Sequence, residues 1–332
     1  MHVSGRVVVL RGDAAHLPLP DGSVDLIVTS PPYFGQRDYR DGGESLKGQI
    51  GNEETPREYV DALLACTREW MRVLKPEGSI FVNLGDKYNS AASNQQSGAA
   101  LLARRGAPRA AGQERATGGR SRALPDVRPK TLLGLPARYT LGCMDDLGLI
   151  VRRDIIWHKL SAQPESVTDR CATRHEYLFH LVKQPRYFAA SQTNAANPPG
   201  KLPGSVWEIA AIPLVVPARI AHACCCQGFP KADCGGLAHY AAFPFELPRR
   251  CILGWSPPSA LVADPFGGTG TTALVASMLG RDAATFDLSA DYCRLARWRT
   301  ADPAERARAL GVPKPPPVPD GQGDLFELGE AS

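Results

Sequence analysis

The sequence predicts an α/β protein in which short buried strands alternate with helices, and two stretches carry this prediction. Residues 260–263 form an apolar strand that leads through a glycine-containing loop into a helix at 273–279, and the next strand, 282–286, ends at Asp287. This succession is typical of the nucleotide-binding unit of α/β folds. Far upstream, a buried strand at 24–29 runs directly into Ser30-Pro31-Pro32-Tyr33, called the hook below.

The bulk properties are those of a globular protein without a membrane-spanning or secretory segment. Of the 332 residues 43% are hydrophobic and 22% charged, and the formal net charge is +4. A charge this small permits a nucleic-acid partner without requiring one. The apolar run at 7–10 is too short for a signal peptide or a membrane span. Nine cysteines without a framework indicate reduced thiols and a cytoplasmic protein.

The other elements follow from apolar patterning and from helix caps. Residues 6–10 form a first strand. The segment Thr55-Pro56-Arg57-Glu58 opens a helix with a capping threonine, proline at the first position and glutamate at the third. Apolar residues at helical spacing continue this helix until Pro76 and Gly78 end it. We predict further strands at 79–84, 149–151, 154–157 and 177–182, and further helices at 132–147, 243–253 and 290–301, the second of which we expect Pro248 to interrupt.

Two stretches do not fit this alternation. Residues 87–130 carry nine basic and two acidic residues, a net +7, so we interpret them as a flexible basic insertion, either a solvated loop or a flap that contacts phosphates. Residues 191–242 are irregular, and the cysteines and histidines between 222 and 239 lack the spacing of metal ligands. His175-Glu176 and His180 also have the wrong spacing for a zinc-protease helix. We therefore predict no metal site.

The hook is chemically unusual for a simple turn. Its two prolines fix two φ angles and remove two N–H donors, and the residue before each proline is pushed into extended geometry. The result is a stiff bend with free carbonyl groups, the hydroxyl of Ser30 on one side and the ring of Tyr33 on the other. Such a bend suits a flat ligand that carries an NH₂ group.

The glycine-containing loop, Asp264 to Thr272, is called the cofactor loop below. Gly268 and Gly270 allow close approach of a ligand to the backbone, and Asp287 is placed to accept hydrogen bonds from ribose hydroxyls. Asp264 would repel a pyrophosphate and attract an ammonium group. Adenosine joined to an amino acid meets both conditions, which indicates S-adenosylmethionine, whereas a nicotinamide cofactor explains the glycines alone.

Together the two stretches resemble the amino-directed DNA methyltransferases. The cofactor loop resembles that family's cofactor-binding motif, and Thr29 to Tyr33 resembles its catalytic motif. The catalytic motif comes first by more than two hundred residues, which is the circular order of the beta class. The resemblance implies a Rossmann-like, doubly wound, mostly parallel sheet of seven strands with both motifs at adjacent strand ends. It extends to Gly12-Asp13 and to residues 48–51, 83–86, 154–159 and 164–177.

The resemblance also implies the site residues. The catalytic residues are Ser30, Pro31, Pro32 and Tyr33. The predicted S-adenosylmethionine contacts are Asp13, Asp264, Pro265, Phe266, Gly268, Gly270, Thr271, Thr272 and Asp287. The basic insertion does not match the family's common pattern, and the DNA contacts are predicted from basic residues: Arg37, Arg104, Arg105 and Lys159.

The implied reaction is methyl transfer to the exocyclic amino group of a base flipped out of double-stranded DNA. Ser30 in the hook favours cytosine N4 as the target, whereas aspartate or asparagine there would favour adenine N6, which stays the alternative. No Pro-Cys pair is present, which excludes carbon-5 cytosine methylation. A nicotinamide oxidoreductase, an RNA methyltransferase and a non-catalytic DNA-binding module are the more distant alternatives.

These inferences divide the chain into six regions. We expect a catalytic half at 1–86 and 131–190, the insertion at 87–130, a candidate target-recognition region at 191–242, a cofactor half at 243–302 and a disordered tail at 303–332. In the tail, Gln322 to Phe326 resembles the peptide with which bacterial proteins bind the replication sliding clamp. The predicted partners are therefore double-stranded DNA and the clamp, in a nucleoid-associated cytoplasmic enzyme.

Overall fold

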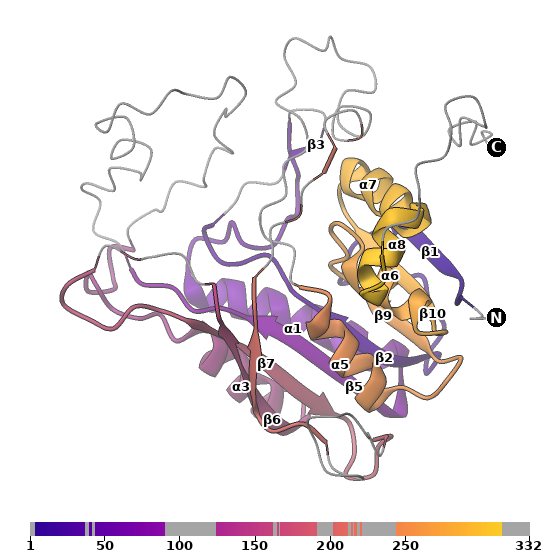
Figure 1. The fold of residues 1–332 in the computed structure, drawn as a ribbon. Helices are drawn as coiled ribbons and strands as arrows, with labels where there is room; N and C mark the ends of the chain where they lie inside the picture. The colour runs from indigo at the N-terminus through magenta and orange to yellow at the C-terminus, as the bar shows by residue number, and fades with distance from the viewer. Residues whose placement is uncertain are drawn as a thin grey trace, which may run out of the picture.

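A computed structural model describes the chain at residues 4–36, 40–41, 44–89, 124–161, 165, 167–190, 202–211, 214, 216–217, 220 and 244–313. Its centre is an eight-stranded sheet in which β7 runs antiparallel to both neighbours and every other pair of neighbours is parallel (Figure 1). The predicted α/β fold with a mostly parallel sheet is confirmed. The strands in spatial order are β1 (Val7–Arg11), β10 (Asp282–Asp287), β9 (Leu261–Asp264), β2 (Val24–Thr29), β5 (Leu74–Leu84), β7 (His175–Val182), β6 (Ile150–Lys159) and β8 (Val206–Ile209).

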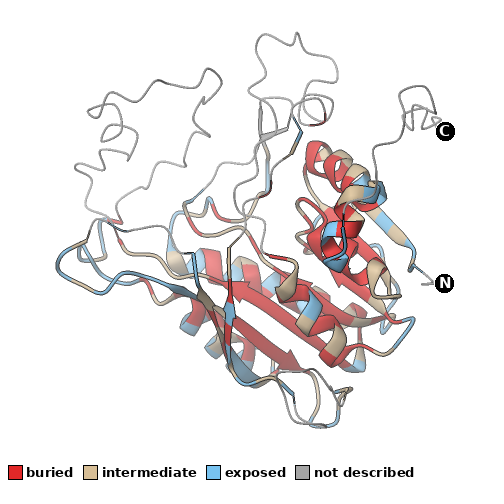
Figure 2. Ribbon diagram, viewed as in Figure 1, coloured by how far each residue is buried: buried red, intermediate tan, exposed pale blue. Residues whose placement is uncertain are grey.

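Helices cover both faces of the sheet and bury it between them (Figure 2). On one face lie α1 (Pro56–Val73) and α3 (Leu135–Asp145), and on the other lie α5 (Glu246–Trp255) and α6 (Thr271–Met278). The helices α7 (Ala290–Ala301) and α8 (Pro303–Leu310) pack against each other and against α6. A separate short hairpin pairs β3 (Arg40–Asp41) with β4 (Glu44–Ser45).

The local signals in the sequence explain where α1 begins. The predicted capping box is present: Glu58 N donates to Thr55 Oγ1 at 3.1 Å, and Thr55 N donates to Glu58 Oε2 at 2.9 Å. These bonds satisfy two of the backbone donors that a helix start leaves free. The helix ends at Val73, two residues before Lys75-Pro76, and the chain continues directly into β5. Proline at position 76 cannot continue a helix but is tolerated near the start of a strand.

Four predictions about the elements need correction. The two strands expected at 149–151 and 154–157 are one strand, β6, with a register irregularity between Val151 and Arg153. Residues 206–209, expected to be irregular, form β8, so the sheet has eight strands instead of seven. The helix at 243–253 is not interrupted, because Pro248 lies in the first turn of α5, where its missing N–H donor is harmless.

The fourth correction concerns the expected disordered tail. Residues 303–310 form α8, which begins with the side chain of Asp302 as cap and Pro303 at its first position. Asp302 Oδ1 accepts from the N–H groups of Ala304 and Glu305, both at 2.9 Å. The composition of this segment gave little apolar signal. The helix α8 is held instead by this cap and by the burial of Glu305 and Ala307. Residues 314–332 lie outside the described part.

The described ends of the basic insertion are also ordered. Asn89 holds them together: its Nδ2 donates to Leu124 O at 3.1 Å and to Val127 O at 2.6 Å, and its Oδ1 accepts from Leu124 N at 3.0 Å. Tyr88 and Leu132 form an isolated antiparallel bridge beside this contact. Residues 87–89 and 124–130 are thus joined by hydrogen bonds, and the predicted flexibility of the insertion stays a prediction for residues 90–123, which lie outside the described part.

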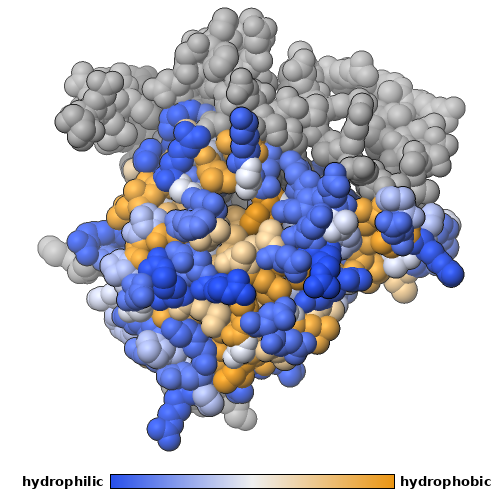
Figure 3. Space-filling model, turned by 180° about the vertical axis from the view of Figure 1, so that it is seen from behind, coloured by the Kyte–Doolittle hydropathy of each residue, from blue (hydrophilic) through white to orange (hydrophobic). Residues whose placement is uncertain are grey.

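The surface is mixed in character. Seen from behind, hydrophilic side chains cover much of the described surface and hydrophobic ones show as smaller areas between them (Figure 3). Exposed large apolar residues include Leu141 and Met144 on α3. No helix in the described ranges combines the length and the apolar character that crossing a bilayer requires.

Candidate active site

The hook and the cofactor loop lie side by side at the carboxyl end of the sheet. The strands that lead into them, β2 and β9, are parallel neighbours with Leu26 opposite Val262 and Ile27 opposite Ala263. Ligands of open parallel sheets bind at this edge. A cavity of about 550 Å³ opens there, a size typical of small-molecule sites. Its lining includes the hook, much of the cofactor loop and residues from β5, β6 and β7.

Backbone geometry shapes the cofactor loop. Gly268 and Gly270 have φ angles of +50° and +75°, which L side chains rarely adopt. Gly270 is also the N-terminal cap residue of α6 and has no side-chain cap, so the helix begins with backbone N–H groups beside the cavity. Asp287 holds the loop in place: its Oδ2 accepts from Gly268 N at 3.0 Å and its Oδ1 from Ser289 N at 2.8 Å.

Asp264 is a buried carboxylate at the base of the cavity. Its side chain is 2% exposed, and its Oδ1 accepts from the Thr29 hydroxyl at 2.7 Å and from Phe266 N at 3.2 Å. Burial raises the pKa of Asp264 from 3.8 to about 6, although the hydrogen bonds from Thr29 and Thr272 act in the opposite direction. The group is therefore mostly ionised at neutral pH, in a position where no described cation neutralises it. A cationic group of a ligand beside Asp264 would offset the free-energy cost of burying this negative charge.

Two side chains hold the hook and the residues that follow it. Tyr59 of α1 donates its hydroxyl proton to Pro32 O at 2.9 Å, and Lys87 Nζ donates to Phe34 O at 3.2 Å and to Gly35 O at 2.8 Å. The expectation of free carbonyls is thus wrong for Pro32. Among the described residues, none donates a hydrogen bond to the Pro31 carbonyl. Pro31 therefore keeps an acceptor available beside the cavity.

The ring of Tyr33 is fixed at its hydroxyl and lies close to Gly85 along one edge. Its hydroxyl donates to Glu176 Oε2 at 2.7 Å, and Glu176 in turn forms an ion pair with Lys159. A Cβ atom at Gly85 would lie 2.9 Å from Tyr33 Cε2, so only glycine leaves room for the ring there. Burial, followed by the negative charge of Glu176, raises the pKa of Tyr33 well above 10, which keeps the phenol neutral.

Acceptor oxygens converge beside this ring. Asn83 Oδ1 lies 3.4 Å from the Tyr33 hydroxyl and 3.5 Å from Ser30 Oγ, both long for hydrogen bonds. Asn83 Nδ2 donates to Tyr177 O at 3.0 Å, and this bond turns the amide oxygen toward the hook. With the Pro31 carbonyl and Glu176, the pocket wall is rich in acceptors. It is matched to a ligand that donates through an NH₂ group.

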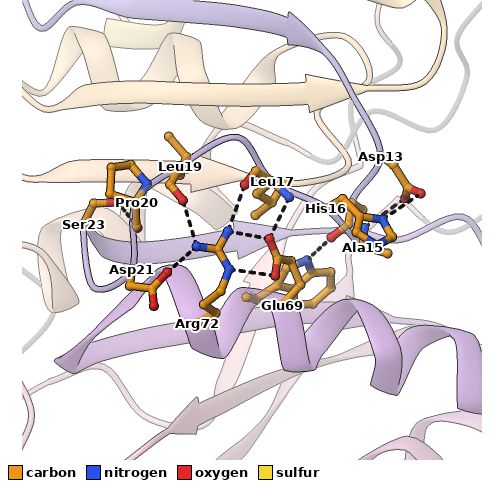
Figure 4. A network of polar contacts seen from close by, with 12 residues as sticks. Asp13, Ala15, His16, Leu17, Leu19, Pro20, Asp21, Ser23, Glu69 and Arg72 are labelled. Atoms are coloured by element: carbon orange, nitrogen blue, oxygen red, sulfur yellow. Dashed lines mark hydrogen bonds and ion pairs between the residues drawn. The ribbon is translucent and has the colours of Figure 1, made fainter.

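The loop after β1 brings Gly12 and Asp13 into the lining of the cavity. Figure 4 shows how α1 holds this loop: Glu69 Oε1 accepts from Leu17 N at 2.8 Å, and Arg72 donates to Leu17 O at 2.9 Å and Leu19 O at 3.0 Å. Arg72 and Glu69 also pair with each other at 2.6 Å. Asp13 Oδ1 accepts from Ala15 N at 2.9 Å, which closes the turn locally.

Most of the predicted site residues meet at this cavity, and a few do not. The lining includes Asp13, Ser30, Pro31, Pro32, Tyr33, Lys159, Asp264, Pro265, Phe266, Gly268, Thr271 and Asp287. Gly270 and Thr272 do not line it: Gly270 starts α6, and the Thr272 hydroxyl points to Val28 O at 3.2 Å. Lys159, expected to contact DNA phosphates, is paired with Glu176 inside the cavity. Arg37, Arg104, Arg105, the 222–239 cluster and 322–326 lie outside the described residues.

Sequence reasoning missed Glu176, Asn83 and Trp157 as cavity residues. Glu176 and Trp157 stand opposite each other in the pairing of β7 with β6. The sequence did contain a signal for Glu176: it is a lone carboxylate at the start of an apolar strand, where a charge is unfavourable unless it has a partner. Within the described ranges, no group of three or more His, Cys, Asp or Glu side chains is arranged to hold a metal ion.

Comparisons with known proteins agree with this arrangement. The model of the N6/N4 DNA methylase family matches residues 24–297. The type II methyltransferase M.SmaI of Serratia marcescens is 33% identical over 304 residues, covering 88% of this chain and 89% of that protein. M.XycI of Xanthomonas campestris pv. cyanopsidis, also a type II methyltransferase, is 35% identical over 295 residues, with 87% and 85% covered.

Two solved structures share the fold at lower identity. The PvuII DNA methyltransferase (cytosine-N4-specific) superposes with a TM-score of 0.59 at 22% identity, over 93% of this chain and 94% of that one. A Thermus thermophilus protein in complex with S-adenosyl-L-methionine superposes with a TM-score of 0.53 at 23% identity, over 92% and 94%. At this level of identity, the two structures support the fold of this chain and nothing further.

Proposed function

Because the chain belongs to the N6/N4 DNA methylase family, and is thus an S-adenosylmethionine-dependent DNA methyltransferase of the restriction–modification type, we propose that its target is the N4 amino group of cytosine. The observation that carries the proposal is Ser30, whose hydroxyl stands in the acceptor-rich wall around the hook at the position where, by the family resemblance, a carboxylate or amide would favour adenine. Adenine N6 is the second candidate, since the same wall accepts any exocyclic amine.

The cavity fits the cofactor in charge and in shape. S-adenosylmethionine supplies an electrophilic methyl group on a sulfonium centre when it is bound. The buried carboxylate of Asp264 would hold its ammonium group, and the positive φ angles of Gly268 and Gly270 leave the loop backbone open to close approach. Asp287 would accept from the ribose hydroxyls, in addition to the backbone bonds it already accepts. No phosphate group has to be placed beside Asp264 in this arrangement.

The hook would receive the target base. A base within a duplex cannot enter the cavity, so it must be flipped out of the stack. The Tyr33 ring, held by Glu176 and Gly85, would stack on the flipped base, an interaction worth about 1–3 kcal/mol. The amine would donate to Ser30 Oγ and the Pro31 carbonyl, which withdraws the nitrogen lone pair from the ring and aims it along the transfer direction. Positioning of this kind can supply up to about 7–11 kcal/mol of the acceleration.

The DNA contacts, the cellular location and the sliding-clamp contact are proposed from the sequence. Double-stranded DNA is the substrate, and we assign its phosphate contacts to Arg37, Arg104 and Arg105. Reduced thiols and a DNA substrate fit a cytoplasmic enzyme, and the five described cysteines are free. Sliding-clamp binding by 322–326 is tested by a pull-down, in which loss of retention on Leu325→Ala and Phe326→Ala supports the contact and unchanged retention refutes it.

The target atom is identified directly by product analysis. Purified protein is incubated with methyl-tritiated S-adenosylmethionine and unmethylated genomic DNA, and the DNA is digested to nucleosides and separated by chromatography. We expect label in N4-methylcytosine. Label confined to N6-methyladenine would refute the cytosine proposal. Label absent from DNA with the wild type would refute the assignment of the hook as a base site.

A further inference from the structure

We propose that Arg299 and Glu305 are positioning residues of the cofactor site, which they hold from behind through a buried ion pair. This inference rests on the proposed binding of S-adenosylmethionine by the cofactor loop. Neither residue lines the cavity. They lie on α7 and α8, the helices that pack beside α6 at the end of the sheet that carries β1, β10 and β9 (Figure 1).

Arg299 directs its guanidinium at the cofactor loop. Its side chain is 3% exposed, and its Nη1 donates to Thr269 Oγ1 at 2.9 Å and to Thr271 Oγ1 at 2.7 Å. The same nitrogen lies 3.3 Å from Thr269 O. Thr269 and Thr271 both line the cavity, and Thr271 is the first residue of α6. The contacts therefore reach the loop at the point where its backbone turns into the helix.

A second contact shows that α7 packs directly on this turn. A Cβ atom at Gly270 would lie 3.0 Å from the Cβ of Ala296, one turn before Arg299 on α7. Gly270 holds a φ of +75°, and α6 has no side-chain cap at this end. The loop thus lacks a cap of its own and takes its support from α7. A buried residue that fixes loop backbone in this way preserves the geometry of a binding site without touching the ligand.

Glu305 explains why Arg299 can stay buried. A guanidinium out of water is costly unless it is paired and its remaining donors are satisfied. Burial lowers the pKa of Arg299, and Glu305, whose Oε2 accepts from Arg299 Nε at 2.7 Å, acts in the opposite direction. The Phe245 ring stacks against the guanidinium with its centroid 5.0 Å away. Glu305 is itself 8% exposed and is placed by the Asp302 cap of α8.

The test compares cofactor affinity in three variants of the full chain. Arg299→Lys keeps the charge and loses the planar fork that reaches both threonines, and Glu305→Gln keeps an acceptor and loses the charge. The matched control is Arg281→Lys at the opposite end of α6, where Arg281 donates to Leu279 O at 2.6 Å and Ser256 O at 2.9 Å, away from the cavity. Isothermal titration with S-adenosylmethionine measures the dissociation constant, and thermal unfolding measures stability.

We expect the dissociation constant to rise about tenfold for Arg299→Lys and for Glu305→Gln and to stay unchanged for Arg281→Lys, even if all three lower the melting temperature. The KM for S-adenosylmethionine should rise while kcat at saturating cofactor and the KM for DNA stay near wild type. If Arg299→Lys does not fold, the dissociation constant of Glu305→Gln tests the inference by itself. A folded variant of either residue with wild-type affinity overturns the inference, whereas a wild type that binds no S-adenosylmethionine overturns the proposed cofactor site itself.

Discussion

Replacing Asp264 by asparagine should make the protein more stable and its cofactor binding weaker. The carboxylate is 2% exposed, and its pKa of about 6 lies above the ordinary 3.8. Because the folded state holds this proton more tightly than the unfolded chain does, stability from this group falls as the pH rises from 3.8 to 6. Above pH 6 the buried negative charge of Asp264 lowers the free energy of unfolding by its full amount. The pKa difference corresponds to about 3 kcal/mol at about 1.36 kcal/mol per pKa unit.

Asparagine keeps an oxygen that can accept from the Thr29 hydroxyl and from Phe266 N, and it carries no charge. Urea unfolding should therefore find Asp264→Asn more stable than wild type by up to about 3 kcal/mol at pH 7.5 and by about half that at pH 5. Titration with S-adenosylmethionine should show about 10- to 100-fold weaker binding, the loss expected for a hydrogen bond to a charged group. A stability difference that does not change with pH would refute the buried-charge argument. Unchanged cofactor affinity would refute the ammonium contact.

Three further changes test other parts of the site and the core. Tyr33→Ala should keep S-adenosylmethionine affinity and lose methyl transfer, and full activity in a tritium assay would exclude the stacking role. Glu176→Gln leaves the Tyr33 hydroxyl an acceptor but removes the ion pair with Lys159, so we expect kcat to fall about tenfold with unchanged cofactor affinity; a wild-type kcat would contradict this. His180, buried against Phe81, has a pKa lowered from 6.5 to about 3, so this group alone should cost the wild type about 2 kcal/mol between pH 7 and pH 5, as the unfolded chain takes up a proton. His180→Gln should lose less over the same range in urea unfolding, and an identical loss would show that His180 is not the titrating group.

The two motifs could be predicted because their chemistry is local. Consecutive prolines set their own φ angles, and the glycines of the cofactor loop mark a backbone that other residues cannot adopt. The capping box at Thr55 and the strand patterns depend on neighbouring residues in the same way. The resemblance of these two segments to the motifs of a known family then placed them at adjacent strand ends, and the pairing of β2 with β9 confirms this placement.

The strand β7 shows where local signals run out. The spacing of His175, Glu176 and His180 correctly excludes a zinc-protease helix, since the segment is a strand. The same reasoning found no role for Glu176. That role depends on Tyr33, 143 residues away, and on Lys159 of the neighbouring strand. Both partners reach Glu176 only after the sheet has formed.

The sequence by itself determined the α/β class, the hook, the cofactor loop and the order of the two motifs, because each is encoded by backbone preferences and side chains within a few residues. Only the tertiary structure decided that Asp264 is buried with a raised pKa, that Glu176 holds Tyr33, and that α8 secures Arg299 behind the loop. Burial and pairing of charges are properties of residues brought together from distant parts of the chain. Their energies depend on the local dielectric and on hydrogen-bond geometry, which exist only in the folded protein.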